Sequence, residues 1–332
     1  MKPRFIFVMH AEHFPQLFGP DELARLRGLV DLVEPLVDPG QLRSTGSRFD
    51  DVEGIISSWG MPELDSELLR TMPRLRAVFH AAGTIKSIAT EASWERGIRI
   101  TSAALENARP TAEFAFAEII LSLKRVWPRL FAMREQRHYQ QLDSLAPSCA
   151  GSTVGLISLG KIGRLVARHL AMLDVNILAW DPHVSPEEAA QLGARLCPLP
   201  ELFAVSHVVS CHTPLTPETR GFLGRALFAS MRPGATFINT ARGGLVREDE
   251  LVAVLQQRAD LFAVLDVTAE EPPAPDSPLF KLRNVALTPH IAGSIGPECL
   301  RLGRMMVDEV SRYLAGEPLL GEVRQEELNV LA

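Results

Sequence analysis

The chain has 332 residues, of which 46% are hydrophobic and 22% charged, and its formal net charge is −6. This length and hydrophobic content predict two globular domains of ordinary size. The acidic balance and the absence of a Lys/Arg run argue against a nucleic-acid-binding protein, because such proteins carry basic patches. No stretch approaches the ~18 apolar residues of a membrane-spanning helix. The apolar start of the chain is interrupted by His10 and Glu12, so a signal peptide is not expected.

The four cysteines form no pattern that binds a metal or builds a disulfide framework. Cys149, Cys197, Cys211 and Cys299 are scattered, and no two of them make a C-x-x-C pair. Metal and disulfide frameworks need clustered spacing. The sequence therefore predicts four reduced thiols, no metal site and a cytoplasmic protein.

The first third of the chain alternates short apolar runs with helical patterns. Strands are predicted at residues 5–9, 54–57 and 77–80, because these runs are short, apolar and rich in β-branched or aromatic residues. Helices are predicted between them at residues 21–29 and 64–69. This alternation predicts a parallel sheet with helices on both faces.

A buried helix is predicted at residues 110–126. Apolar side chains such as Phe114, Phe116 and Ile119 recur on nearly every face, and a helix that is apolar all round is usually covered on all sides. Pro110 suits its first turn, where the missing N–H does no harm. We expect this helix to connect the two domains and to form a subunit contact, so that the protein is a homodimer.

A second alternation begins at Thr153. Helical patterns at residues 162–173 and 248–256 separate some of its strands, and the four prolines of residues 270–278 predict a loop. Strands are predicted at residues 154–158, 175–180, 207–211, 236–239, 262–266 and 285–287. Six strands in this rhythm predict a dinucleotide-binding sheet.

A strand, a tight turn and a helix start are predicted by residues 154–163, VGLISLGKIG. In a dinucleotide-binding fold such a turn presents backbone N–H groups and a helix N-terminus to the pyrophosphate. Gly160 would allow the close approach, and Gly163 would let the helix pack on the strand. Ser158 stands where the first glycine of G-x-G-x-x-G is expected. An ordinary strand-to-helix turn is therefore the alternative interpretation.

Asp181 ends the next predicted strand, about 20 residues farther on, where an acid binds the ribose 2′-hydroxyl. The residues that follow, Pro182-His183-Val184, include no arginine that could neutralise a 2′-phosphate. The sequence therefore predicts NAD rather than NADP. The alternative is a simple Asp-Pro turn.

Five ordered segments resemble the D-isomer-specific 2-hydroxyacid dehydrogenase family. They are the glycine turn, HTPLTPETRG from His212, NTARGGLV from Asn239, LDVTAEEP from Leu265 and LTPHIAG from Leu287. No single segment is specific, but their order is. The resemblance implies an α/β protein of two doubly wound parallel-sheet domains. A Rossmann-type NAD-binding domain, residues 105–294, would be inserted in a flavodoxin-like substrate domain, residues 1–104 and 295–332.

The resemblance implies a catalytic set of Arg242, Glu271 and His290. Arg242 matches the arginine that binds the substrate carboxylate and carbonyl, and a guanidinium offers a fixed fork for a carboxylate. His290 matches the acid/base that exchanges a proton with the substrate oxygen. Glu271 matches its partner, since a nearby carboxylate stabilises imidazolium. Glu270 is the alternative partner, and Glu271 is preferred because it precedes Pro272, as the family glutamate precedes a proline.

Each catalytic candidate also has an ordinary structural interpretation. Arg242, flanked by Gly243, would be a solvated loop residue, Glu271 a solvent-facing acid, and His290 a core histidine. His212 matches no catalytic position and is expected to be structural.

The resemblance also implies the cofactor contacts. Asp266 is expected near the nicotinamide amide, and main chain at Thr240, Ala241 and Gly293 is expected to line the pocket. The complete predicted set is Ser158, Gly160, Lys161, Ile162, Asp181, Thr213, Thr240, Ala241, Arg242, Asp266, His290 and Gly293.

The substrate half departs from the family. HAAGTIKS from His80 replaces the usual glycine-rich loop followed by Asp-Asn. The N–H groups of Ala82 and Gly83 are predicted to hold the substrate carboxylate, with Arg242 and His290 completing the substrate site. Lys86 replaces the usual asparagine and is expected at the surface rather than facing the substrate.

Two further departures bear on the substrate. SSWG from Ser57 falls where phosphoglycerate dehydrogenases tend to carry an arginine for phosphate, so a phosphorylated substrate is disfavoured. Glu271 argues against the formate dehydrogenase branch, which carries glutamine there. The chain is also expected to be a short form, without an added C-terminal regulatory domain.

The sequence therefore predicts an NAD-dependent oxidoreductase that interconverts a small 2-keto acid and its 2-hydroxy acid. Glyoxylate/hydroxypyruvate reductases and D-2-hydroxyacid dehydrogenases are the expected types. One alternative is an NAD-sensing binding protein that resembles the C-terminal binding protein corepressors, although those carry extra segments. Another is a phosphite or phosphoglycerate dehydrogenase on the same scaffold.

Overall fold

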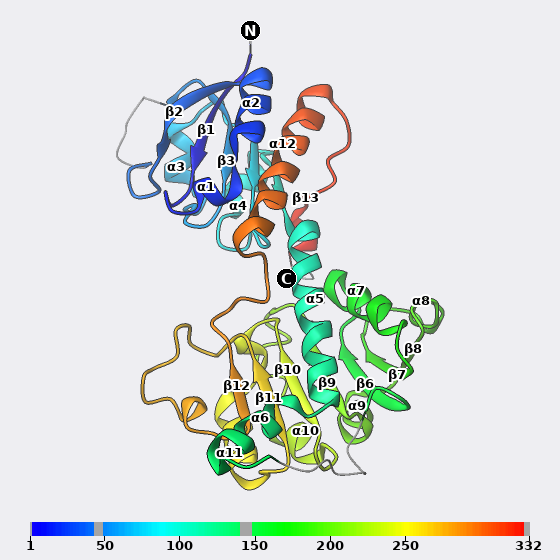
Figure 1. Ribbon diagram of the computed structural model, residues 1–332. Helices are drawn as coiled ribbons and strands as arrows, with labels where there is room; N and C mark the ends of the chain where they lie inside the picture. The colour runs from blue at the N-terminus through cyan, green and yellow to red at the C-terminus, as the bar shows by residue number, and fades with distance from the viewer. Residues whose placement is uncertain (1, 43–48, 140–147, 329–332) are drawn as a thin grey trace. The chain divides into compact units, whose positions relative to one another are not determined.

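The computed structural model describes residues 2–42, 49–139 and 148–328. The chain divides into two compact units: unit 1 runs to Asn107 and resumes at Ser294, and unit 2 is Ala108–Gly293. Each unit contains one β-sheet (Figure 1). The predicted substrate domain also included residues 43–48 and 329–332, which lie outside the described residues.

The sheet of unit 1 has the strand order β13-β5-β4-β3-β1-β2. Its strands are β1 (Arg4–Val8), β2 (Asp31–Val37), β3 (Val52–Ser57), β4 (Ala77–His80), β5 (Arg99–Ser102) and β13 (Glu322–Val323). All neighbours pair in parallel except β13, which pairs antiparallel with β5. The order 2-1-3-4-5 is that of flavodoxin-like folds, with its switch point between β1 and β3.

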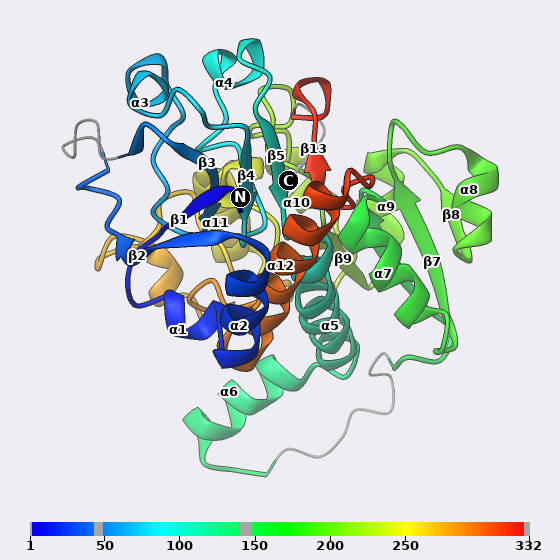
Figure 2. The same ribbon diagram turned by 90° about the horizontal axis from the view of Figure 1, so that it is seen from above.

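Helices cover both faces of this sheet because apolar side chains alternate along its strands. Phe5 and Phe7 pack against α1, α2 and α12, whereas Ile6 and Val8 pack on the side of α3. The helices are α1 (Phe14–Leu17), α2 (Pro20–Leu29), α3 (Ser66–Thr71), α4 (Glu91–Glu95) and α12 (Cys299–Ala315). Figure 2 shows α3 and α4 on one side of the sheet and α1, α2 and α12 on the other. Burying one such large apolar side chain contributes about 1.5–3 kcal/mol.

The sheet of unit 2 has the strand order β12-β11-β10-β9-β6-β7-β8, and every described pair is parallel. Its strands are β6 (Ser152–Ile157), β7 (Val175–Trp180), β8 (Ala194–Leu196), β9 (Val208–Cys211), β10 (Thr236–Asn239), β11 (Phe262–Leu265) and β12 (Val285–Leu287). The order reverses between β6 and β9, as it does in Rossmann folds. The predicted fold class, α/β with two doubly wound parallel sheets, is confirmed.

Two cores cover the faces of this second sheet. Helices α5 (Ala104–Leu123), α7 (Lys161–Leu170) and α8 (Pro186–Gln191) bury one face. Helices α9 (Leu199–Val205), α10 (Arg225–Ser230) and α11 (Glu248–Gln257) bury the other. Short 3-10 turns are Gly243–Leu245, Pro278–Phe280, Gly296–Glu298 and Gln325–Glu327.

The helix predicted at residues 110–126 is wrong in its bounds. α5 already begins at Ala104, and the Asn107 N–H bonds the Ala103 carbonyl at 3.0 Å to close its first turn. Pro110 therefore lies inside the helix rather than in its first turn. The helix ends at Leu123 because Arg125 takes a left-handed φ of 54°, after which α6 (Val126–Gln136) begins.

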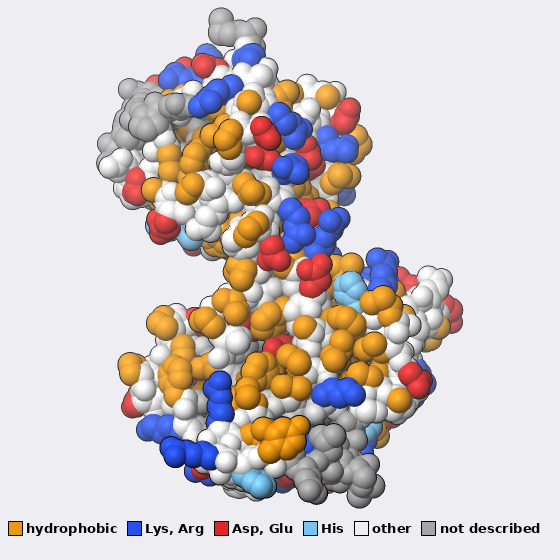
Figure 3. Space-filling view, in the orientation of Figure 1, with side chains coloured by type: hydrophobic (Ala, Val, Ile, Leu, Met, Phe, Trp, Pro, Cys, Tyr) orange, Lys and Arg blue, Asp and Glu red, His pale blue; other side chains and the backbone are white. Residues whose placement is uncertain are grey.

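α6 packs less tightly than the other long helices. None of its residues is buried, and Figure 2 shows it standing out from the sheet of unit 2. Its Trp127 and Phe131 are half-buried, as is Phe116 of α5. Hydrophobic side chains gather over this part of unit 2 in Figure 3.

Several strands were missed by the sequence patterns. β2 and β5 in unit 1 and β8 in unit 2 are short or carry mixed polar and apolar residues, so they resemble loops. The sheet of unit 2 therefore has seven strands where six were expected. Among the described residues, no helix is both long enough and apolar enough to cross a membrane.

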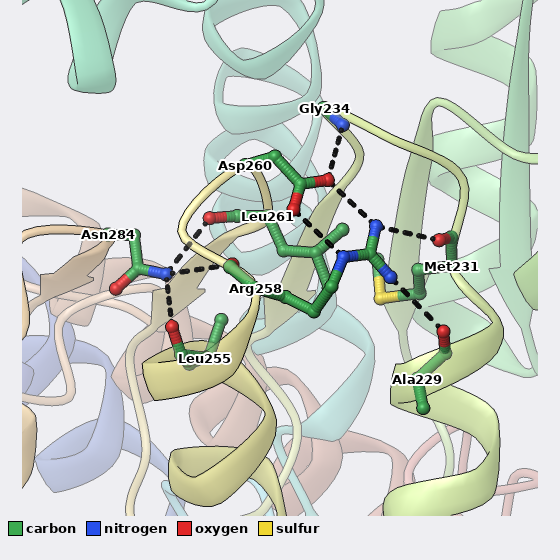
Figure 4. A network of polar contacts seen from close by, with 8 residues as sticks. All are labelled: Ala229, Met231, Gly234, Leu255, Arg258, Asp260, Leu261 and Asn284. Carbon is green, nitrogen blue, oxygen red and sulfur yellow. Dashed lines mark hydrogen bonds and ion pairs between the residues drawn. The ribbon is translucent and has the colours of Figure 1, made fainter.

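Arg258 is the centre of a hydrogen-bond network at the amino end of the unit 2 sheet (Figure 4). Its guanidinium donates to the carbonyls of Ala229 at 3.2 Å and Met231 at 3.3 Å, and pairs with Asp260 at 2.7 Å. The Asp260 carboxylate in turn accepts from the Gly234 N–H at 3.2 Å. The end of α10 and the entries to β10 and β11 are thereby joined.

Asn284 completes this network at the entry to β12. Its amide nitrogen lies within hydrogen-bond distance of the carbonyls of Leu255, Arg258 and Leu261, at 3.0, 3.4 and 3.1 Å. Without Asn284, these carbonyls at the end of α11 and the start of β11 would lack this hydrogen-bond donor. The network fixes the amino ends of the strands whose opposite ends carry the predicted site.

Candidate active site

The predicted catalytic and cofactor residues of unit 2 follow the carboxyl ends of five strands. The glycine turn follows β6, Thr213 follows β9, Arg242 follows β10, Asp266 follows β11 and His290 follows β12. In open parallel sheets, ligands bind outside the carboxyl ends, at the switch point. The fold therefore gathers at one edge residues that lie far apart in the sequence.

The glycine turn is tight at Gly163. A Cβ at that position would lie 2.1 Å from the carbonyl oxygen of Ser158, so only glycine lets α7 pack this closely on β6. Gly160 is exposed and caps the N-terminus of α7. Lys161 is exposed and Ile162 half-buried in the first turn of that helix. Backbone N–H groups at this helix end suit a pyrophosphate.

Ser158 is strained where a glycine was expected. It takes a φ of 78°, in the left-handed region that non-glycine residues rarely adopt. Its hydroxyl lies 3.2 Å from Oδ2 of Asp181. The substitution therefore joins the glycine turn to the predicted ribose-binding acid.

The Asp181 carboxylate is already held by main-chain donors. Leu159 N–H donates to Oδ2 at 2.7 Å, and His183 N–H donates to Oδ1 at 2.8 Å. Because a carboxylate has about four acceptor positions, the Ser158 and Leu159 donors use those of Oδ2. One position on Oδ1 remains for a ribose hydroxyl, so the residue fits the predicted role.

Asn239, which no sequence motif indicated as a site residue, shapes the turn that carries Arg242. Its side-chain amide donates to the Arg242 carbonyl at 3.0 Å, and its Oδ1 accepts the Ala241 N–H at 3.0 Å. Arg242 Nη1 donates to the Ala241 carbonyl at 2.6 Å. Burial lowers the pKa of Arg242 and the Glu271 carboxylate opposes this shift. Because arginine stays protonated in proteins, the site contains a poorly hydrated cation.

Gly243 brings the arginine turn against the loop that carries Glu271. A Cβ on Gly243 would lie 1.8 Å from the Thr268 carbonyl oxygen, so a larger residue would separate the two segments. Thr268 N–H donates to Oε1 of Glu271 at 3.2 Å, and its hydroxyl donates to the Glu270 carbonyl at 2.5 Å. This close packing orients the Glu271 side chain.

Glu271 lies beside His290. Its Oε2 is 2.7 Å from Nδ1 of the imidazole, and the two side chains are 38% and 51% exposed. Of the two neighbouring acids, Glu271 therefore makes this contact. A carboxylate at Nδ1 keeps the proton on that nitrogen and leaves Nε2 to exchange a proton with a ligand.

Asp266 organises the turn that carries His290. Its Oδ1 accepts from the Thr288 hydroxyl at 2.6 Å and the Ile291 N–H at 2.9 Å, while Oδ2 accepts the Ala292 N–H at 2.8 Å. These bonds hold His290 at a left-handed φ of 55°. One acceptor position on Oδ2 remains, which fits the predicted contact with a nicotinamide amide. The bonds to the turn were not foreseen from the sequence.

Two buried polar side chains at this edge lack partners among the described residues. Both ring nitrogens of His212 and the hydroxyl of Thr240 have no hydrogen-bond partner. Burial lowers the pKa of His212 to about 4, so the imidazole is neutral at pH 7. Thr213 is buried too, and its hydroxyl lies 3.3 Å from the Ile157 carbonyl. Unpartnered donors and acceptors beside the glycine turn fit a polar cofactor.

The predicted carboxylate-binding loop of unit 1, which begins at His80, contains a main-chain hydrogen bond of its own. Ala82 N–H donates to the His80 carbonyl at 2.8 Å, and its contact with a substrate carboxylate stays a prediction. Gly83 lies against Asn107, whose Nδ2 is 3.0 Å from the position of a Cβ. Lys86 is exposed. The loop rests on His80, which is buried, 2.9 Å from the Ser57 hydroxyl, and has its pKa lowered to about 4 by burial.

No group of three or more His, Cys, Asp or Glu side chains within the described residues is arranged to hold a metal ion. Gly293, the last residue of unit 2, is half-buried after the His290 turn.

Comparison with known proteins agrees with this geometry. Residues 117–292 match the NAD binding domain of the D-isomer specific 2-hydroxyacid dehydrogenases. The D-3-phosphoglycerate dehydrogenase of Archaeoglobus fulgidus is 33% identical over 79% of this chain and 49% of its own length. The chain thus spans about half the length of the curated relatives it matches.

Two solved structures share the fold. The TT0316 protein of Thermus thermophilus is 28% identical, with a TM-score of 0.77 over 97% of this chain and all of its own. The D-mandelate dehydrogenase of Rhodotorula graminis is 23% identical, with a TM-score of 0.81 over 100% of this chain and 99% of its own. The predicted family and the predicted cofactor, NAD, are confirmed. The chain belongs to the D-isomer specific 2-hydroxyacid dehydrogenase family, and its unit 2 contains the NAD-binding domain of that family.

Proposed function

We propose that the protein is an NAD-dependent dehydrogenase that interconverts a small 2-keto acid and its 2-hydroxy acid. The observation that carries the proposal is the 2.7 Å contact between His290 Nδ1 and Glu271 Oε2, together with the half-buried Arg242, which interacts electrostatically with Glu271. A polarised imidazole and a poorly hydrated guanidinium are what carbonyl reduction of a keto acid requires.

Each residue has a separate task in this proposal. Arg242 binds the substrate carboxylate and draws electron density from the carbonyl oxygen. His290 Nε2 gives its proton to that oxygen as the carbon receives a hydride, and Glu271 stabilises the imidazolium that exists before the transfer. NADH, when bound, supplies the hydride. In the reverse direction, His290 takes the hydroxyl proton.

Asp266 and Asn239 act as positioning residues in this mechanism. They order the two turns from which His290 and Arg242 project, through the bonds at 2.6–3.0 Å described above. A geometry fixed before substrate arrives lowers the reorganisation needed in the transition state. The main-chain N–H groups of Ala82 and Gly83 are the proposed contacts of the substrate carboxylate in unit 1.

The test is NADH oxidation by the purified chain with glyoxylate, hydroxypyruvate, pyruvate and 3-phosphohydroxypyruvate. Turnover of at least one unphosphorylated keto acid is expected. A protein that binds NADH but turns over none of the four would instead match the NAD-sensing, corepressor-like alternative. An inorganic-phosphite assay tests oxidation of phosphite on the same scaffold.

Phosphoglycerate dehydrogenase activity is the second candidate, favoured by the curated relatives of that name. Against it, residues 57–61 (SSWGM) contain no arginine or other charge to hold a phosphate. A kcat/KM for 3-phosphohydroxypyruvate well above those for the other three acids would favour this candidate.

We also propose that the protein is a cytoplasmic homodimer. The described cysteines, Cys149, Cys197, Cys211 and Cys299, are all free, which suits a reducing compartment. The half-buried Trp127 and Phe131 on α6 offer apolar surface for a second copy. Sedimentation at micromolar concentration tests the dimer, and a monomer there would reject it.

A further inference from the structure

Three aromatic rings that the proposed mechanism does not use lie together at the carboxyl edge of the unit 1 sheet. His10 and His13 follow β1, and Trp59 follows β3. The strand order places the switch point of this flavodoxin-like sheet between β1 and β3. The crevice outside a switch point is where such sheets bind ligands.

Main-chain bonds and ring contacts make this cluster a defined surface. His10 N–H donates to the Trp59 carbonyl at 3.0 Å, and His13 N–H donates to the His10 carbonyl at 3.1 Å. The ring centroids of His13 and Trp59 are 4.9 Å apart, and those of His10 and His13 are 6.3 Å apart. Gly60 has a φ of 95°, and a Cβ there would lie 2.5 Å from the His10 ring. The imidazole therefore rests on a position that only glycine leaves open.

The cluster is continuous with the loop proposed to hold the substrate carboxylate. Ala81 N–H donates to the Ser57 carbonyl at 2.7 Å, and the Ser58 hydroxyl donates to the Ala81 carbonyl at 2.9 Å. The segment that carries Trp59 is thus bonded directly to the residue before Ala82. A substrate held by its carboxylate at this loop would extend its other end along the same edge.

The chemistry of the edge favours a flat, uncharged group. Trp59 is 36% exposed, whereas Trp94, Trp127 and Trp180 are half-buried. Residues 57–61 carry no charge, and the exposed carboxylate of Glu12 lies on the same connection as the two histidines. An acid on this connection disfavours a phosphate, while indole and imidazole faces attract an aromatic ring.

We propose that His10, His13 and Trp59 form a specificity-determining subsite for an aryl group on the substrate, so that the enzyme prefers aromatic 2-keto acids. The inference rests on the proposed function. It agrees with the absence of charged side chains in residues 57–61.

The test compares kcat/KM for NADH-dependent reduction of phenylpyruvate, pyruvate and 3-phosphohydroxypyruvate by the full chain. Phenylpyruvate is expected to be the best of the three. Trp59→Ala should lower kcat/KM for phenylpyruvate about tenfold, mainly through KM, and leave that for pyruvate within about twofold, since aromatic contacts and pocket hydrophobicity act on the aryl group alone. Trp59→Phe, which keeps a ring, should recover most of the loss. Phe280→Ala, which removes another exposed aromatic side chain, is the matched control and should behave as the unmodified protein.

Three outcomes would overturn the inference. Equal losses for phenylpyruvate and pyruvate in Trp59→Ala would make Trp59 structural. A preference for 3-phosphohydroxypyruvate that His10→Ala or His13→Ala abolishes would make the cluster an anion site. In both cases pyruvate turnover would leave the proposed function standing. Turnover of none of the three acids would reject the proposed function itself, and the subsite with it.

Discussion

The two ends of the unit 2 sheet are built in opposite ways. At the amino ends of β10, β11 and β12, Arg258 and Asn284 bond to five carbonyls, and Asp260 pairs with Arg258 (Figure 4). At the carboxyl ends, both nitrogens of His212 are buried without partners in the described part of the chain, and Ser158 and His290 take left-handed backbone conformations. The polar groups of the amino edge are hydrogen-bonded, whereas the carboxyl edge contains polar atoms without partners among the described residues and strained backbone.

This difference indicates which edge is built for stability and which for ligand binding. Unsatisfied buried groups and left-handed residues each cost stability, and they persist where the surrounding structure enforces them. Here the enforcement is visible, since Asp266 bonds to the His290 turn and Asp181 to the glycine turn. The hydrogen bonds at the amino edge hold the strands in register. The fold therefore tolerates the loss of stability from the unsatisfied groups and left-handed residues at the carboxyl ends.

The largest expected effect comes from removing the proton donor at the carboxyl edge. His290→Ala should lower kcat for keto-acid reduction about 10²–10⁴-fold, because a general acid contributes that much. NADH binding, followed by fluorescence titration, should change little. Asn284→Ala, a substitution at the amino edge, serves as the comparison and should leave kcat unaltered. Comparable turnover by His290→Ala and the unmodified protein would remove His290 from the catalytic set.

Arg258→Ala tests the amino edge by stability instead of rate. The change removes the hydrogen bonds to the Ala229 and Met231 carbonyls and leaves the Asp260 carboxylate with the Gly234 N–H but without its ion pair. It should lower the free energy of unfolding by about 1–3 kcal/mol, the net contribution of hydrogen bonds that involve a charged group. Urea denaturation measures this loss, and kcat/KM of the folded protein should stay unaltered.

Arg195→Ala is the matched control for this loss. Its guanidinium is 65% exposed and pairs only with Glu201 among the described residues. Such a surface ion pair contributes less than about 1 kcal/mol. If both arginine variants lost the same small amount, the amino-edge network would have no special role in stability.

His212 predicts how the carboxyl edge responds to acid. Burial lowers its pKa in the folded protein to about 4, from the ordinary value of 6.5 for histidine. Below pH 6.5 the unfolded chain binds a proton that the folded protein does not take up until about pH 4. Stability is therefore lost as the pH falls through this window, at about 1.4 kcal/mol per pH unit, or about 2 kcal/mol at pH 5.

His212→Leu should remove this acid sensitivity, because leucine neither titrates nor leaves a buried polar atom unpaired. The loss of unfolding free energy between pH 7 and pH 5 should shrink by about 2 kcal/mol. His183→Leu, which removes an exposed imidazole, is the control and should keep the original pH dependence. An equal loss in both variants would mean that the buried imidazole is not the group responsible.

Glu271→Gln should lower kcat for keto-acid reduction about tenfold and leave NADH binding little changed. Glutamine can still accept a hydrogen bond from Nδ1 of His290, but it lacks the negative charge that lies against the imidazole during proton transfer. Glu270→Gln is the matched control and should keep the original kcat. A loss of kcat in Glu270→Gln and not in Glu271→Gln would reverse the assignment.

The sequence was sufficient for the repeating features of the fold. Strands β4, β7, β10 and β12 have the predicted bounds because each is a short apolar run between turns. The predicted start of α5 was wrong because Pro110 is typical of a first helical turn. The sequence before Pro110 does not indicate that the helix already begins at Ala104. β2 and β8 were missed because their apolar residues do not alternate cleanly.

Sequence alone was less informative about how the site is assembled. Motifs indicated Glu271 and His290, and the structure brings them to 2.7 Å. The three bonds from Asp266 to the His290 turn depend on tertiary geometry that no local pattern encodes. The juxtaposition of His10 with Trp59 depends on the strand order of unit 1, which spacing along the chain does not reveal.

The smallest expected effect concerns the strain at Ser158. Its φ of 78° costs a residue with a Cβ about 1–2 kcal/mol, whereas glycine adopts it freely. Ser158→Ala keeps that cost and loses the bond to Asp181, while Ser158→Gly loses both. The glycine variant should therefore be more stable than the alanine variant by about 1 kcal/mol in urea denaturation.

Ser230, exposed at the end of α10, supplies the control pair. There the order should reverse, because alanine favours helix over glycine by up to about 1 kcal/mol. Alanine more stable than glycine at both positions would show that Ser158 is not strained, and that this carboxyl edge carries less cost than its backbone conformation indicates.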